Sequence, residues 1–120
     1  AAQLAKAVAQ DAAAFSAAEA LHAATLGGAK AMAMDDVIGS LEPGKQADIA
    51  CISFDSIEGQ PMFEAISQIV YATGRQQVSD VWIAGKPKLR ERRLVDMDEA
   101  GILANARQWR GRIAQIEVSR

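Results

Sequence analysis

The chain has 120 residues, a hydrophobic content of 50% and a formal net charge of −2. These values fit one small folded domain, argue against disorder and give no indication of nucleic-acid binding. No apolar run reaches the roughly 18 residues of a membrane-spanning helix, so we expect no membrane segment.

Helices are predicted for the first 34 residues. Apolar residues at helical spacing predict a short amphipathic helix over residues 1–10. Ser16, followed three residues later by Glu19, forms a capping box that predicts the start of a second helix. We expect this helix to run to about Leu26, to stop at Gly27-Gly28, and to be followed by a short helix in "AKAMAM".

The stretch "IGSLEPGKQADIACISF" reads as a turn that leads into a strand. Pro43 and Gly44 suit the two central positions of a type II turn. The following "DIACISF" is apolar on both faces, so this strand is expected to be covered on both sides. Cys51 then reads as core filler rather than a nucleophile.

The second half of the chain predicts a helix, a hairpin and a last helix. "MFEAISQIVYAT" indicates a helix over residues 62–73 with Gly74 as its stop. "VSDVWIAGKPKLRERRLV" predicts two strands about a turn at Gly85. Asp96, with Glu99 three residues on, is expected to cap the C-terminal helix. Its expected buried stripe comprises Ile102, Leu103, Ala106, Trp109, Ile113 and Ile116. We expect Trp82 and Trp109 to be mostly buried, with Trp109 pinning this helix to the sheet or its neighbours.

Charge is distributed unevenly along the chain. Residues 1–84 carry a net charge of −6 and residues 85–120 a net charge of +4. The basic run "KPKLRERR" could form a phosphate or RNA patch or the solvated face of a hairpin. Glu91 interrupts the run and no aromatic residue interleaves with it, which favours the solvated face.

Few residues could carry chemistry. His22 is the single histidine, so the chain cannot build a histidine-rich metal site by itself. Asp35 and Asp36 could bind a hard cation or be merely solvated, and Lys45 and Asp48 could form an exposed pair or serve as turn residues. With Cys51 as the single cysteine, no internal disulfide can form, and a cytosolic protein is the default. We therefore assign no catalytic, cofactor-binding or metal-binding residue.

Two motifs resemble a known family. "SAAEALHAATLGGAKAMAMDDVIGSLEPGKQADIACIS" is similar to the carboxy-terminal part of the amidohydrolase superfamily. The later run "ISQIVYATGRQQVSDVWIAGKPKLRERRL" resembles the branch of methylthioadenosine/S-adenosylhomocysteine deaminases and triazine or ammeline chlorohydrolases. The resemblance implies a mixed α and β architecture in three parts. Residues 1–34 would be terminal helices of a metal-dependent (β/α)8 barrel, residues 35–95 part of a small β-sandwich with an inserted helix near 62–73, and residues 96–120 a C-terminal helix.

The resemblance also implies a function for the parent protein. Such enzymes are cytosolic hydrolases in which Zn²⁺ or Fe²⁺ activates a water that attacks a C–N or C–Cl bond of a nitrogen heterocycle. The family's metal-binding motifs match no residue of this chain, so the stretch alone is expected to be catalytically incomplete. The missing barrel portion would be its partner. The stripes that include Leu4, Val8, Leu21, Ala24 and Met32 would otherwise lack cover, so we also expect self-association.

Two alternatives remain open from the sequence. The chain could be a free-standing, non-catalytic binding module that uses the same sandwich. It could also be a complementing subunit whose barrel partner is a separate chain. Neither alternative involves nucleic acid or a membrane.

Overall fold

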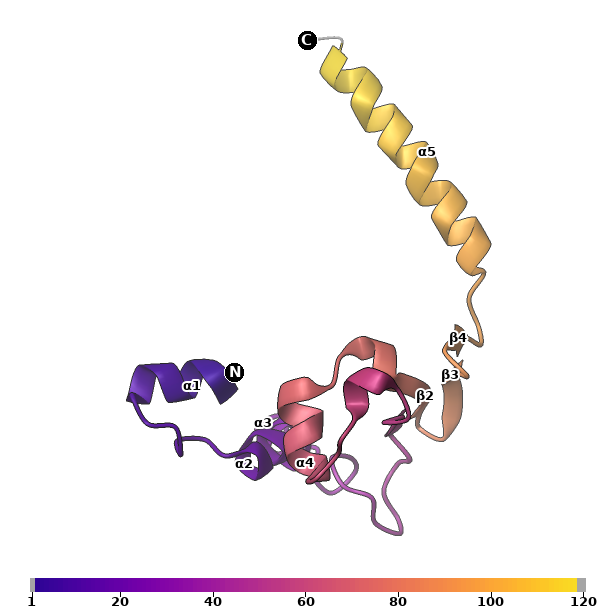
Figure 1. Ribbon diagram of the computed structural model, residues 1–120. Coiled ribbons are helices and arrows are strands. Elements are labelled where there is room, and N and C mark those ends of the chain that lie inside the picture. The colour runs from indigo at the N-terminus through magenta and orange to yellow at the C-terminus, as the bar shows by residue number, and fades with distance from the viewer. Residues whose placement is uncertain (1, 119–120) are drawn as a thin grey trace.

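The structure, a computed structural model, describes residues 2–118, and the chain in it is open rather than compact. The radius of gyration is 19.4 Å, whereas a compact domain of this length has about 14 Å. Figure 1 shows the cause: α5 (Glu99–Val118) projects away from the rest of the chain, and α1 (Ala2–Ala9) lies at the opposite side. Most apolar side chains therefore have few neighbours.

The predicted capping box starts the second helix, α2 (Ala17–His22). The Ser16 backbone N–H donates to the Glu19 carboxylate at 2.7 Å, and the Glu19 N–H donates to Ser16 Oγ at 3.3 Å. The hydrogen bond from the Ser16 hydroxyl lowers the pKa of Glu19 below its ordinary value. This cap therefore stabilises the helix above the ordinary pKa of a glutamate and weakens as the pH falls through the lowered pKa.

The expected stop at Gly27-Gly28 is wrong. The helix continues as a π-helical segment over Ala23–Gly27 and then as α3 (Gly28–Ala31), so that one helix spans residues 17–31. A Cβ on Gly27 would lie only 3.1 Å from the carbonyl oxygen of His22. Glycine avoids this close contact in the π-helical turn, although it weakens an ordinary helix.

The inserted helix is shorter than predicted. It comprises α4 (Ala65–Ser67) and a π-helical continuation over Gln68–Ala72. Glu64 starts it, because its carboxylate accepts hydrogen bonds from two backbone N–H groups of the first turn. The helix ends where Thr73 turns extended and its hydroxyl donates to the Gln68 carbonyl at 3.0 Å, so the stop comes one residue before Gly74. Short 3₁₀ turns occupy Ile57–Gly59 and Arg75–Gln77.

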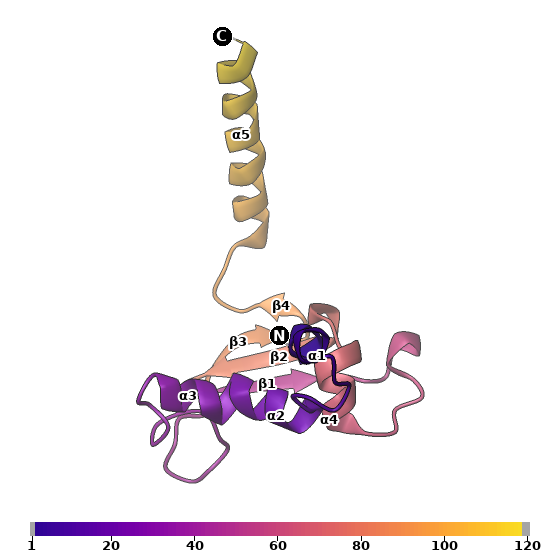
Figure 2. The ribbon, with the colours of Figure 1, turned by 90° about the vertical axis from the view of Figure 1, so that its left-hand side faces the viewer.

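Four antiparallel strands form one sheet in the order β1-β2-β3-β4. They are β1 (Ile49–Ile52), β2 (Val78–Ile83), β3 (Lys86–Arg90) and β4 (Arg93–Leu94). The predicted turn at Gly85 is confirmed: Ala84 and Gly85 both have positive φ, as a tight two-residue hairpin requires. Figure 2 shows β1 at the edge of the sheet, next to the α2 and α3 helix.

The strand expected to be buried on both faces is not buried in this chain. Ala50 and Cys51 are exposed, while Ile49 and Ile52 are half-buried. The sequence pattern anticipates two covering layers, but residues 2–118 form only this one sheet. Cys51 consequently does not fill a core here. Trp82, on β2, is half-buried.

The last helix differs from the prediction at its start and along its stripe. Asp98 caps it rather than Asp96, because Asp98 Oδ1 accepts from the Gly101 N–H at 3.0 Å. Asp96 instead pairs with Lys88. The expected buried stripe of α5 is exposed, and Trp109 is 59% exposed and pins nothing. The amphipathic pattern is present, but no other part of the described chain covers it.

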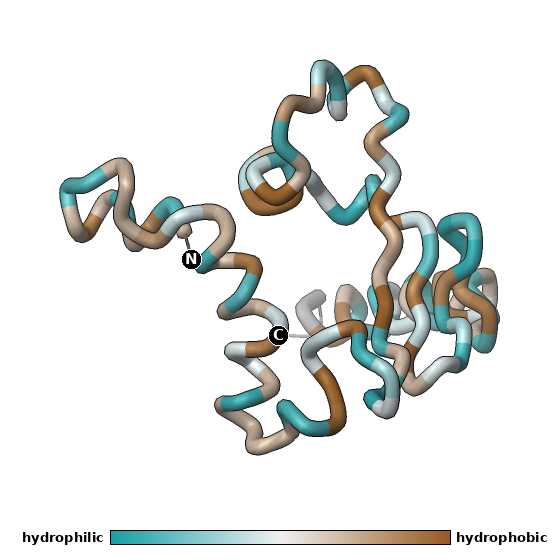
Figure 3. The backbone as a smooth tube through the Cα atoms, turned by 90° about the horizontal axis from the view of Figure 1, so that it is seen from below, coloured by the Kyte–Doolittle hydropathy of each residue, from teal (hydrophilic) through white to brown (hydrophobic). Residues whose placement is uncertain are grey.

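Few residues are buried. Among residues 2–116, the buried hydrophobic residues are Ala2 and Ala29, and no large side chain is fully enclosed. Hydrophobic positions lie dispersed along the backbone rather than around one centre (Figure 3). Residues 2–116 therefore form local helices and strands but only a very small tertiary core.

Candidate functional site

The turn at Pro43-Gly44 adopts the predicted conformation. The Lys45 N–H donates to the Glu42 carbonyl at 3.2 Å, and Gly44, at the third position, has a φ of +96°. Positive φ at this position is the requirement of a type II turn. The turn thus directs the chain from the helices towards β1.

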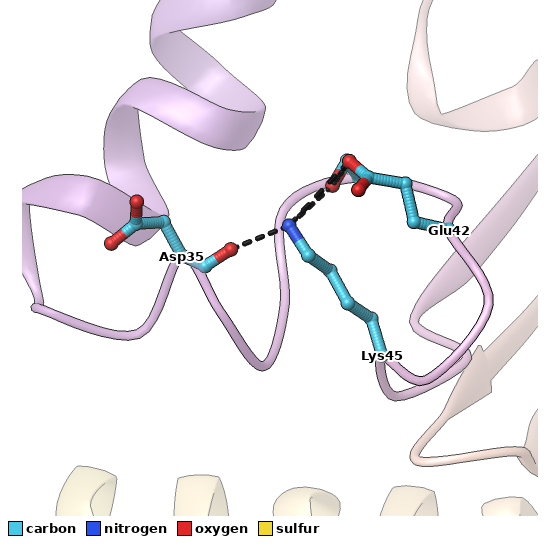
Figure 4. Close-up of polar contacts among 4 residues, drawn as sticks. Asp35, Glu42 and Lys45 are labelled. Atoms are coloured by element: carbon cyan, nitrogen blue, oxygen red, sulfur yellow. Dashed lines mark hydrogen bonds and ion pairs between the residues drawn. The ribbon is translucent and has the colours of Figure 1, made fainter.

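The partly buried side chain of Lys45 stabilises the loop that contains this turn. Its side chain is only 13% exposed, and its ammonium group donates to the Asp35 carbonyl oxygen at 2.5 Å and to Ser40 Oγ at 2.7 Å. The Glu42 carboxylate lies 3.6 Å away (Figure 4). The pKa of Glu42 is lowered, first by the hydrogen bond from the Ser40 hydroxyl and then by the charge of Lys45. With these three partners around its ammonium group, Lys45 acts as a structural strut.

Asp48 fastens the same segment to the hairpin. Its Oδ1 accepts from the Ala84 N–H at 2.7 Å, and the Gly85 N–H donates to the Ala47 carbonyl at 3.0 Å. The sequence leaves open whether Lys45 and Asp48 form an exposed pair or serve as turn residues. The structure supports turn residues, because the two side chains bind different partners. Both residues therefore support the scaffold.

The remaining candidates do not converge on a site. His22, Asp36 and Cys51 are exposed, and Asp35 contributes its backbone carbonyl rather than its carboxylate to the Lys45 contact. Across residues 2–118, no three His, Cys, Asp or Glu side chains lie close enough together to hold a metal ion. The residues present therefore do not fit a zinc centre.

A large groove lies between the helix of residues 17–31 and the edge strand β1. Its volume is about 630 Å³. Apolar side chains dominate its lining. They come from the helix and its C-cap (Leu21, Ala24, Ala29 and Met32), from β1 (Ile49) and from the inserted helix (Ile69). The sequence predicts these apolar faces but not that they would face each other across an unfilled space.

Three of the five basic side chains in the hairpin run contact other residues of the chain. Lys88 contacts Asp96 at 2.8 Å, and Arg90 lies 3.5 Å from Asp80. Arg92 donates to the Gln76 carbonyl. The pKa of Asp80 is lowered, chiefly by the Ser79 hydroxyl and then by the Glu91 N–H and Arg90. Such exposed contacts are typical of a solvated hairpin face, which stays a prediction.

The sequence predicts that the chain has no membrane segment. Within residues 2–118, every helix is too short or too polar to traverse a bilayer.

Comparison with known sequences identifies the relatives. Residues 1–88 match the amidohydrolase family. The 5-methylthioadenosine/S-adenosylhomocysteine deaminase of Teredinibacter turnerae is 44% identical over 108 residues, which cover 90% of this chain and 24% of that protein. The enzyme of the same name from Saccharophagus degradans is 36% identical over 92% of this chain and 25% of its own length. The chain thus spans about a quarter of the length of the curated relatives it matches.

Solved structures agree with the sequence comparison. A zinc-bound adenosine deaminase from Xanthomonas campestris is 60% identical and superposes with a TM-score of 0.89 over 95% of this chain and 26% of its own. The zinc complex of atrazine chlorohydrolase from Arthrobacter aurescens is 30% identical, with a TM-score of 0.70 over 77% of this chain and 20% of its own.

The first of these superpositions also bears on α5. A match over 95% of 120 residues omits about six, so it includes most of the 20 residues of α5. A TM-score of 0.89 leaves little room for a helix of that length to point elsewhere. The projecting direction of α5 is therefore a feature shared with a longer relative. On this fold and these matches, the chain belongs to the amidohydrolase family.

Proposed function

We propose that this chain is the carboxy-terminal part of a zinc-dependent amidohydrolase that deaminates an adenosine-type nucleoside. The observation that carries the proposal is the match, in sequence and in structure, to deaminases over nearly the whole chain. Deamination is favoured over dechlorination because the Teredinibacter and Xanthomonas deaminases are 44% and 60% identical to the chain, whereas the atrazine chlorohydrolase is 30% identical. The substrate itself would be chosen by parts of the fold outside this chain.

In this proposal the chain supplies scaffold. The helices of residues 2–31 would belong to the end of a (β/α)8 barrel, the four-stranded sheet would be part of a β-sandwich, and α5 would close the chain. Because the described residues offer no metal cluster, zinc would be held by the rest of the enzyme. A free-standing binding module or a complementing subunit would use the same elements without catalytic groups.

A chimera tests the proposed function. The quarter of the Xanthomonas relative that matches this chain is replaced by residues 1–120, and ammonia release from adenosine and 5′-methylthioadenosine is measured with zinc supplied. We expect the chimera to deaminate at least one of them, whereas the isolated chain binds no zinc stoichiometrically and releases no ammonia. A folded, zinc-loaded chimera without activity on either nucleoside would contradict the proposal, and chloride release from atrazine would favour the dechlorination alternative.

Self-association of the isolated chain is a further part of this proposal. Leu4, Val8 and Met32 are exposed, as is the stripe of α5, so the chain has not repacked these faces internally. Exposed apolar surface on this scale is seldom left facing water. We expect sedimentation over a hundredfold range of concentration to show a mass that increases with concentration. A strict monomer that binds no hydrophobic dye would contradict this expectation.

A further inference from the structure

We draw no further inference here: the strongest candidate, the apolar groove of about 630 Å³ between the helix of residues 17–31 and the edge strand β1, is an unpartnered surface, and nothing in the structure shows what covers it.

Discussion

Replacing Gly39 by alanine is expected to destabilise the chain by about 3 kcal/mol. Gly39 has a φ of +93°, a left-handed conformation that costs an alanine about 1–2 kcal/mol. In addition, the new Cβ would lie 2.6 Å from the Cβ of Ala29 and 3.1 Å from the Cα of Leu26. Ala29 is only 2% exposed and both neighbours belong to the helix of residues 17–31, so no flexible side chain can move aside.

Gly44→Ala is the control that separates the cost of the left-handed backbone conformation from the cost of the close contact. Gly44 has nearly the same backbone conformation, with a φ of +96°, but no atom lies within 4 Å of the Cβ position. Its replacement should therefore show only the conformational cost of about 1–2 kcal/mol. Urea unfolding of both variants measures the difference. Equal losses at the two glycines would mean that the loop does not press against the helix as described.

Local rules account for the parts of the fold that the sequence predicts well. The capping box of Ser16 and Glu19, the turn at Pro43-Gly44 and the hairpin about Gly85 each depend on residues within a few positions of one another. Their conformations follow mainly from these nearby residues, although Ala47 and Asp48 also bind the turn at Gly85. For this reason they appear as expected in a chain that has almost no core.

The mispredicted features depend on more than local sequence. Gly27 stays helical in a π-helical segment where an added Cβ would crowd the His22 carbonyl oxygen at 3.1 Å, whereas a propensity scale treats glycine as a stop. Asp98 rather than Asp96 caps α5, and the Asp96 carboxylate pairs with Lys88 on β3 instead. For α5 and β1, the sequence correctly identifies which residues form an apolar stripe or face. A pattern records that a residue is to be covered but not which polypeptide covers it.

In the candidate site, too, some features follow from the sequence and others depend on contacts that the sequence does not reveal. The absence of a histidine cluster follows from composition, whereas the role of Lys45 does not, because its main partner is a backbone carbonyl ten residues away. A carbonyl leaves no signature in the sequence. From sequence alone, a lysine beside acidic residues is therefore indistinguishable from an ordinary exposed ion pair.

Lys45→Met is expected to lower the free energy of unfolding by about 2 kcal/mol, because methionine keeps most of the aliphatic stem and removes the ammonium group. The loss comes from charge-assisted hydrogen bonds in a partly buried setting, which are worth about 1.5–3 kcal/mol. Lys88→Met is the matched control: Lys88 also makes a 2.8 Å ion pair, with Asp96, but its side chain is 44% exposed. Its loss should stay below about 1 kcal/mol and shrink further in high salt.

The difference between the two lysines would identify what holds the passage from helix to sheet. The Asp35 carbonyl does not titrate, so most of the Lys45 contribution should persist when acid protonates Glu42. The Glu42 share is present above the ordinary pKa of a glutamate and is lost as the pH falls through its lowered value. If urea unfolding shows equal losses for both lysines, or if the Lys45 effect disappears in acid, the strut would be an ordinary surface ion pair. A retained effect would mean that backbone geometry, set by this one largely buried ammonium group, fixes how the helices meet β1.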